Sequence, residues 1–273
     1  MKVIYAKTFP KFSAPEGHPL EDAFFADNRI AVIADGITRD SIGCPNLNVS
    51  SDEDIYRNYP NPSPASKAAQ LVAETFSMNC NNTKNLDELV FLSNISIANL
   101  NKNVVCDYLE NDLAGCVFST AYIENNILHY SYICDCGIIV WDKYGNIRFQ
   151  TNDDKLEVDP YIAEALRAVP WELPECRVLV RKDFRNNPNN FSSDGKCVSY
   201  GALTGEVSAM HFVKYGTFKL NPGDVVGIYS DGFEPFFKRN DFFENLSNID
   251  EYVHQLESQR GYGSEKTFIL VSA

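Results

Sequence analysis

Two long apolar runs in this sequence each lead into an Asp-Gly pair. The first spans residues 30–36 and contains Asp35, and the second spans residues 225–232 and contains Asp231. Runs of this length and β-branched content are typical of buried strands, so we expect both carboxylates where a strand leaves a core. An ionised carboxylate at such a position is costly unless a cation or a hydrogen-bond donor compensates its charge.

Asp22 and Asp135 stand in similar positions, beside the apolar runs 23–26 and 127–134. Several carboxylates at strand ends are typical of a site for Mg²⁺ or Mn²⁺, because these ions prefer oxygen ligands and keep bound waters. The alternative is that each aspartate caps a turn, since Asp-Gly is a common turn dipeptide. These residues by themselves leave both interpretations open.

Length and hydropathy favour one domain over residues 1–273. The chain is 44% hydrophobic, which is enough for a sizeable core, and no linker or internal repeat divides it. No apolar run approaches the ~20 residues of a membrane span. Residues 1–7 are typical of a first strand rather than of a signal peptide. We therefore predict a cytoplasmic protein with no membrane partner.

Charge and cysteine content exclude other classes of protein. The net charge is −13 and the basic residues do not cluster, which argues against a nucleic-acid partner. The eight cysteines are scattered, and only Cys134 and Cys136 are close together, so neither a disulfide framework nor a zinc pattern is present. We interpret these two as small core residues, with a redox or soft-metal pair as the alternative.

Helices and strands are predicted in separate blocks. Apolar periodicity indicates one helix after an N-cap at Ser63 or Ser66 and a second over residues 86–109. Shorter helices are expected near residues 160–168 and 241–256. Strands are expected at residues 3–6, 23–26, 30–34, 117–123, 127–134, 138–141, 147–150, 177–180, 212–220, 224–230 and 267–271. The four from 117 to 150 are interpreted as an antiparallel meander, and the block order favours α+β layers.

A polar segment over residues 38–64 separates the first strands from the first helix. It is rich in proline, asparagine and charged residues, so it does not form a core of its own. It is either a lid or recognition element beside Asp35, or a tolerated surface insertion.

Six short motifs, taken in order, resemble the metal-dependent protein phosphatase 2C family, in particular its bacterial-type stand-alone catalytic domains. They are Glu21-Asp22 and the segments 32–36, 115–121, 132–135, 201–205 and 230–233. The resemblance covers nearly the whole chain. It implies a sandwich of two antiparallel β-sheets flanked by helices, with metal ions in a cleft at one end.

The resemblance also implies a set of metal ligands. Asp35 would bridge two Mg²⁺ or Mn²⁺ ions, Gly36 would bind through its carbonyl group, and Asp231 would hold one ion. Asp22 would be a ligand or would act as a base through water. Asp135, together with Asp231, would serve a third and weaker site that some members use. The implied activity is hydrolysis of phosphoserine or phosphothreonine in a phosphorylated protein by a metal-activated water.

The sequence departs from the family pattern in its last motif. Residues 264–267 stand where the family has Asp-Asn-x-Thr, so Ser264 replaces a usual metal-binding aspartate. Glu265 is a candidate replacement ligand, and a site with fewer or weaker ions is the alternative. The strand motif around Asp135 keeps only its acid.

The family's phosphate-binding arginine is also missing from the stretch before Glu21. Lys11, His18 and Arg39 are the candidates for that role, although arginine binds phosphate bidentately and lysine offers a point charge. His18 is also a candidate general acid. These departures leave two further hypotheses: a catalytically weak or inactive phosphatase-like binding or regulatory protein, and a phosphatase of small metabolites that uses residues 38–64 for specificity.

Overall fold

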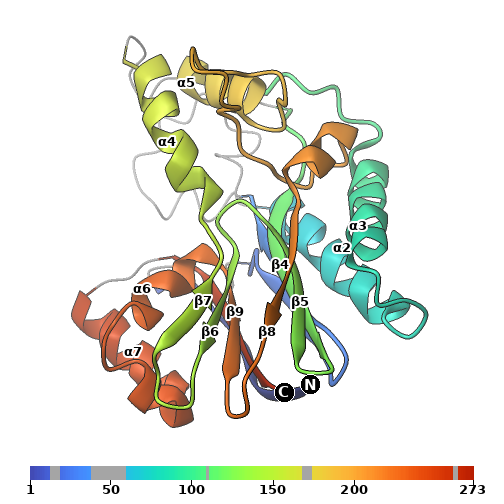
Figure 1. Ribbon diagram of the computed structural model, residues 1–273. Helices are drawn as coiled ribbons and strands as arrows, with labels where there is room; N and C mark the ends of the chain where they lie inside the picture. The colour runs from blue at the N-terminus through green and yellow to red at the C-terminus, as the bar shows by residue number, and fades with distance from the viewer. Residues whose placement is uncertain (13–18, 38–59, 109–110, 168–173, 261–263) are drawn as a thin grey trace.

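Two five-stranded antiparallel sheets form the centre of the protein in this computed structural model (Figure 1). The structure describes residues 1–12, 19–37, 60–108, 111–167, 174–260 and 264–273. The β1 sheet has the strand order β1 (Lys2–Phe9), β10 (Lys266–Ser272), β9 (Val225–Tyr229), β6 (Gly137–Trp141) and β7 (Ile147–Gln150). The β2 sheet has the order β2 (Ala23–Ala26), β3 (Ala31–Gly36), β4 (Cys116–Glu124), β5 (Ile127–Ile133) and β8 (Lys214–Lys219). The predicted two-sheet sandwich is confirmed.

Alternation along the strands explains why the two sheets pack face to face. In β3, Ala31 and Ile33 are buried in a cluster with Ile228 and Ile269 of the β1 sheet. Val32, on the opposite side of β3, is buried instead in the cluster that includes the flanking helices. Because successive side chains of a strand point to opposite faces, a strand that is apolar at every position is buried on both sides.

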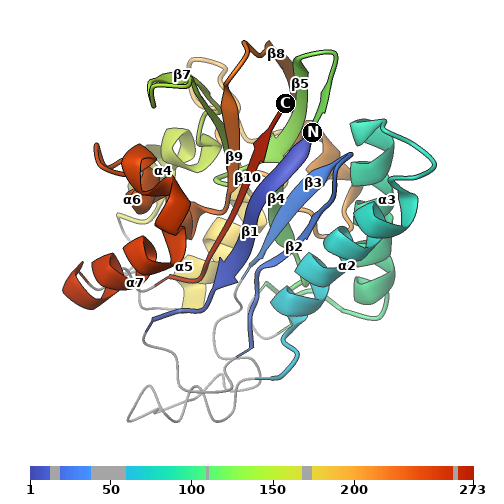
Figure 2. The same ribbon diagram turned by 90° about the horizontal axis from the view of Figure 1, so that it is seen from below.

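Helices cover the outer face of each sheet (Figure 2). The helices α2 (Pro64–Asn79) and α3 (Leu86–Asn101) lie on the β2 sheet, and α6 (Glu234–Phe237) and α7 (Ile249–Arg260) lie on the β1 sheet. Ser63 is the N-cap of α2, and its hydroxyl accepts a hydrogen bond from the Ser66 amide. In the described ranges, no helix combines the length and apolar character needed to span a lipid bilayer.

The helix predicted over residues 86–109 is shorter than expected. It ends at Asn101, and its apolar residues Ile95 and Leu100 are exposed. The buried Asn101 side chain donates to the carbonyl groups of Ala114 and Thr204. The helix therefore ends where a polar side chain begins to hold neighbouring loops, which apolar spacing does not reveal.

The predicted antiparallel meander over residues 117–150 is wrong in one respect. The hairpins β4–β5 and β6–β7 both form, but they belong to different sheets. The chain crosses between the sheets at residues 134–136, where Cys134 has a left-handed backbone with φ of 65°. Cys134 and Cys136 are buried free thiols beside this crossover, in agreement with their interpretation as core residues.

A separate lobe lies beyond one end of the sandwich. This α4–α5 lobe comprises α4 (Asp154–Ala165), α5 (Pro174–Leu179), a π-helical turn (Val180–Phe184) and the segment that continues to residue 200. Its small core contains Val158, Ile162, Cys176 and Phe184.

Two predictions within the lobe need correction. The strand predicted at residues 177–180 is wrong, because the chain there is helical and sets Leu179 and Val180 against the core around Cys176. Cys176, Leu179 and Val180 are three and four positions apart, which is the spacing of one face of a helix. The β-branched composition of residues 177–180 had favoured a strand. The helix predicted from residue 160 starts earlier, at an Asp153 N-cap, and holds Pro160 inside it.

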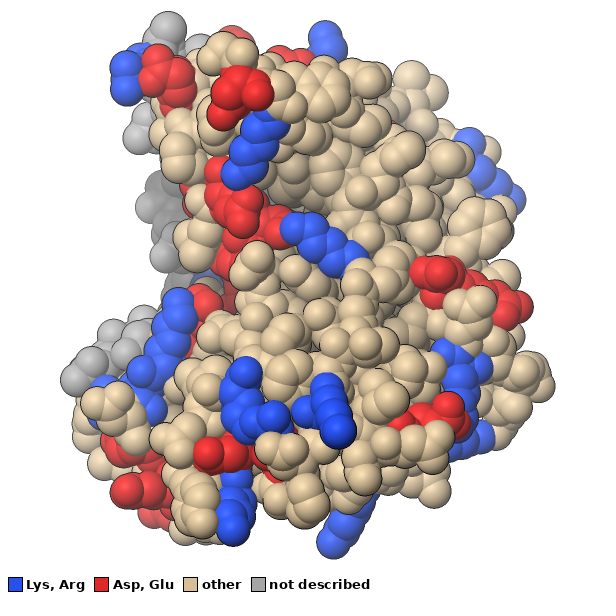
Figure 3. Space-filling view, in the orientation of Figure 1, with Lys and Arg blue, Asp and Glu red and all other residues tan. Residues whose placement is uncertain are grey.

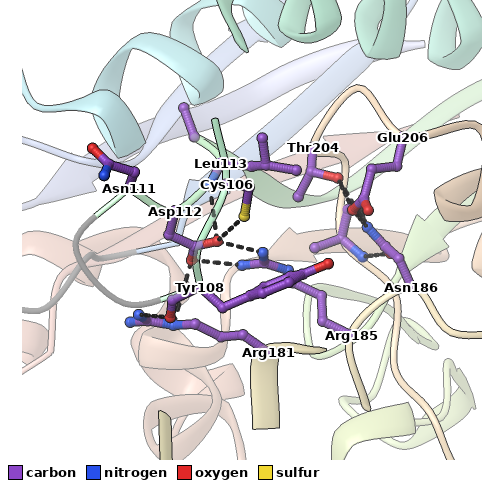
Figure 4. A network of polar contacts seen from close by, with 12 residues as sticks. Cys106, Tyr108, Asn111, Asp112, Leu113, Arg181, Arg185, Asn186, Thr204 and Glu206 are labelled. Carbon is purple, nitrogen blue, oxygen red and sulfur yellow. Dashed lines mark hydrogen bonds and ion pairs between the residues drawn. The ribbon is translucent and has the colours of Figure 1, made fainter. Parts of the chain in front are cut away.

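An ion pair attaches the lobe to the segment before β4 (Figure 4). Arg185 donates from both terminal nitrogens to the two carboxylate oxygens of Asp112, at 2.9 and 2.5 Å. Both side chains are buried. Burial opposes ionisation of Asp112, but the hydrogen bonds and charge of Arg185, with the charge of Arg181, outweigh it and lower the pKa of Asp112. Arg181 also donates to the Tyr108 carbonyl oxygen at 3.0 Å.

Candidate metal centre

Acidic residues from distant parts of the chain meet at one end of the sandwich. Burial raises the pKa of Asp35 well above its usual value, and the charges of Asp22, Asp231, Asp135 and Glu265 raise it further. The effect of a charge falls with distance, so these five carboxyl groups lie in one region of the structure. Figure 3 shows acidic side chains gathered in the recess between the lobe and the sandwich.

The two sheets contribute different members of this group. Asp35 has the same parity in β3 as Ala31 and Ile33, so it belongs to the face of the β2 sheet that points toward the other sheet. Asp231 directly follows Ser230 at the end of β9, and Glu265 directly precedes β10. The site therefore lies across the interface between the sheets.

Asp22 is tied to the β1 sheet by hydrogen bonds. Its carboxylate accepts from the hydroxyl groups of Ser230 at 2.8 Å and Thr267 at 2.7 Å. The residue is 8% exposed, and burial raises its pKa to about 6 despite these donors, with the charge of Asp231 adding to the shift. These donors hold the Asp22 side chain in a defined orientation.

Glu265 braces the chain just before β2. Its two carboxylate oxygens accept hydrogen bonds from the backbone amides of Glu21 at 3.0 Å and Asp22 at 2.6 Å. Burial raises the pKa of Glu265 to about 7, and the charge of Asp22 adds to this. Ser264, which precedes it, is exposed. The predicted role of Glu265 as a metal ligand stays a prediction, because in this structure its oxygens are used to position Asp22.

Two glycines allow backbones to approach closely at the site. A Cβ atom on Gly36 would lie 2.7 Å from the Ala65 carbonyl carbon and from the Glu21 carbonyl oxygen. A Cβ atom on Gly232 would lie 2.0 Å from the Glu265 carbonyl oxygen. Neither glycine has a positive φ, so the backbone conformation does not require a glycine at these positions. Close packing does, because a side chain would collide with the neighbouring backbone.

Lys155 is a member of the site that sequence reasoning missed. Its ammonium nitrogen lies 3.0 Å from a carboxylate oxygen of Asp135. Asp231 is exposed at the surface of the site, and partial loss of water around its carboxyl group raises its pKa. The charge of Asp135 adds to that shift, whereas the charge of Lys155 opposes it. The available signal was a lysine in the first turn of a helix, where acidic residues are favoured.

The described residues do not form a ready-made coordination shell. Within them, no three Asp, Glu, His or Cys side chains stand as they would around a metal ion. The reason is visible in the contacts, because Asp22, Glu265 and Asp135 turn oxygens toward their own donors. The acids nevertheless raise the pKa values of Asp35 and Asp231, and among the described residues they outnumber the lysine beside them, Lys155. In its chemistry, an all-oxygen set of acids fits a hard divalent cation.

Two predicted catalytic residues lie outside the described residues. These are His18 and Arg39, and most of the segment 38–64 lies there too. Their roles in phosphate binding and proton transfer stay predictions.

Known proteins resemble this chain in structure, whereas comparison by sequence finds no match. No protein-family model and no curated protein sequence matches the chain. Among solved structures, the serine/threonine phosphatase PstP/Ppp of Mycobacterium tuberculosis matches with a TM-score of 0.61 and 18% identity, over 99% of this chain and 98% of that one. The PPM Ser-Thr phosphatase MsPP of Mycobacterium smegmatis matches with a TM-score of 0.57 and 15% identity, over 100% of this chain and 99% of that one. The chain has the PPM phosphatase fold.

Two structures with this PPM fold were determined with divalent ions. The catalytic domain of PstP in complex with two manganese ions matches with a TM-score of 0.58 and 18% identity, over 97% of this chain and 95% of that one. RsbX in complex with magnesium matches with a TM-score of 0.51 and 13% identity, over 97% of this chain and 92% of that one. At these identities the likeness establishes the fold.

Proposed function

We propose that this protein is a metal-dependent serine/threonine protein phosphatase that hydrolyses phosphomonoesters of phosphorylated proteins. The observation that carries the proposal is the meeting of Asp22, Asp35 and Asp231 at the interface of two sheets with the PPM fold. Acids that raise one another's pKa across a protein core are costly, and a bound cation offsets that cost. The manganese and magnesium in PstP and RsbX support Mg²⁺ or Mn²⁺ as that cation.

In this proposal Asp35, Gly36 and Asp231 hold two ions, with Asp22 as a ligand or as a base through water. When bound, the ions would lower the pKa of a water molecule and offset charge on the phosphoryl oxygens. The chain's own contribution is orientation: Ser230 and Thr267 hold the Asp22 carboxylate by hydrogen bonds. Packing around the two Asp-Gly glycines limits movement of the strand ends. No protein nucleophile is needed.

One observation favours a second candidate, a catalytically weak phosphatase-like regulatory protein. Glu265 is the predicted replacement for the aspartate lost at Ser264, yet both of its oxygens accept backbone hydrogen bonds. If Glu265 keeps these bonds, one carboxylate is missing from the metal site.

The cytoplasmic location and the absence of nucleic-acid partners also remain predictions.

The test is hydrolysis of a phosphothreonine peptide by chelator-treated protein, with and without added Mn²⁺ or Mg²⁺. We expect activity only with metal, and a loss of about 100-fold or more in Asp35→Asn and in Asp231→Asn because ligand changes weaken metal binding and orientation. Asp159→Asn, an exposed acid on α4, is the control and should keep full activity.

Activity that survives both the chelator and the two substitutions would contradict the proposal. Metal binding without turnover of any phosphopeptide would favour the regulatory candidate. A parallel panel of small phosphorylated metabolites tests the remaining alternative, which predicts that they are hydrolysed faster than the peptide.

A further inference from the structure

Lys155 is placed beside the acidic group by the start of α4. The Asp153 side chain caps this helix by accepting hydrogen bonds from the amides of Lys155 and Leu156. The cap fixes the backbone of Lys155, and its side chain reaches back to Asp135 at the crossover between the sheets. The Asp135 side chain is 11% exposed, so the pair lies at the edge of the recess.

The position of Lys155 is not explained by helix stability. The first turn of a helix carries partial positive charge, which favours acidic residues and disfavours a lysine there. Asp154 and Glu157 fit that rule, whereas Lys155 does not. Its charge instead acts on Asp135 and, with smaller effect, on Asp231. The favourable interaction of this lysine is therefore with the acidic group.

A second lysine near the same helix provides a comparison. Lys196 pairs with Glu157 of α4 at 2.9 Å, and the two side chains are equally exposed at 49%. Lys155 is exposed to a similar degree, at 50%, but its partner Asp135 is largely covered. Pairs between two exposed side chains contribute little to stability and are easily exchanged for water. The ammonium group of Lys155 is thus directed to a shielded carboxylate that has other acids around it.

We propose that the Lys155 ammonium group, 3.0 Å from the Asp135 carboxylate, occupies the place of a cation at Asp135, so that a third divalent ion is excluded and the protein binds two. This rests on the proposed function, in which Asp35 and Asp231 hold two ions. The ammonium group offsets part of the negative charge that a third ion would otherwise neutralise. Because Lys155 belongs to the α4–α5 lobe, the same contact ties the lobe to the metal site.

The experiment counts Mn²⁺ ions bound per chain by equilibrium dialysis, with isothermal titration calorimetry as a second readout. We expect two ions for the wild type and three for Lys155→Met, because removal of the ammonium group frees Asp135 and leaves Asp231 without its opposing charge. Lys155→Arg keeps a cation and should bind two. Lys196→Met breaks the matched exposed pair and should also bind two.

The double variant Lys155→Met/Asp135→Asn locates the added ion and should return to two. Lys155→Gln, which keeps a polar side chain, should bind three and provides a second neutral substitution. Circular dichroism establishes that each variant is folded.

Equal counts for the wild type and both neutral variants would overturn the inference while leaving the proposed function intact. Three ions bound by the wild type, or by the double variant, would also overturn it. A wild type that binds no Mn²⁺ would instead contradict the proposed function, and the inference would fail with it.

Discussion

The sandwich and the α4–α5 lobe are stabilised in different ways. The core between the sheets is built from strand residues with no exposed surface, among them Ile33, Val140 and Ile269. The lobe has a smaller core whose buried members range from 1% exposed at Cys176 to 8% exposed at Leu166. Ion pairs that end on Asp112 and Asp135 attach the lobe to the rest of the protein. Apolar burial thus dominates the sandwich, whereas ion pairs contribute to the attachment of the lobe, together with Tyr200, which packs against the cores of both regions.

A pair of core substitutions tests this difference and has the largest expected effect. Phe268 is fully buried and stacks on Phe233 with ring centroids 4.3 Å apart. Phe268→Ala should lower the free energy of unfolding by ~3–5 kcal/mol, as is usual for loss of a buried aromatic ring. Phe184→Ala, in the core of the lobe, should change that free energy less but should speed proteolysis within residues 174–200. Urea denaturation and limited proteolysis measure the two effects, and equal global losses would contradict the comparison.

The attachment of the lobe should depend on pH. The folded-state pKa of Asp112 is below its usual value, so its pairing stabilises the fold above the ordinary aspartate pKa of about 3.9 and is lost as the pH falls through the lower folded value. Hydrogen exchange should therefore show the lobe opening in acid before the sandwich does.

Asp112→Asn should reproduce this loss of stability near neutral pH and lower the free energy of unfolding by ~3–5 kcal/mol, because it leaves the buried Arg185 charge unpaired. Asp142→Asn, in an exposed turn, is the control. A lobe that stays as protected as the strands in acid would show that its small core is sufficient to hold it.

The smallest expected effect is at the start of α2. Ser63→Ala removes the N-cap and should cost ~1 kcal/mol in the free energy of unfolding. The Ser63 hydroxyl also donates to the Glu21 carboxylate, so phosphatase activity should fall as well if the chain before Asp22 loosens. Ser77→Ala, at an exposed position in the same helix, is the control for thermal unfolding. Unchanged activity in Ser63→Ala would show that the remaining contacts, such as those of Glu265, hold this segment without Ser63.

Much of the sandwich could be predicted from the sequence because its strands are apolar runs bounded by turns. The predicted bounds of β2 and β7 agree with the structure, and those of β3 and β10 differ at their ends. The meander failed because strand patterns identify neighbours along the chain but do not say which sheet each hairpin joins. The turn at Cys134 decides that, and its left-handed backbone is unusual for a residue other than glycine.

The lobe and the details of the site were harder to predict for a physical reason. In the lobe, short helices are stabilised by contacts such as Arg185 with Asp112, which join residues 73 positions apart in sequence. Local apolar spacing carries no trace of such a contact. The aspartates of the site were found because each stands beside an apolar run, whereas Lys155 stands in an acidic helix start and Glu265 is occupied by backbone donors.

The hydrogen bond from Thr267 to Asp22 joins residues 245 positions apart, and it has a consequence for biosynthesis. A growing chain on the ribosome makes Asp22 long before Thr267, so the strand that holds Asp22 leaves the exit tunnel more than 240 residues later. Until β10 is added, Asp22 lacks this donor and Glu265 is absent from the segment before β2. The nascent protein therefore cannot assemble its acidic centre until residues 265–267 have left the ribosome, and a product that stops before β10 lacks the organised centre.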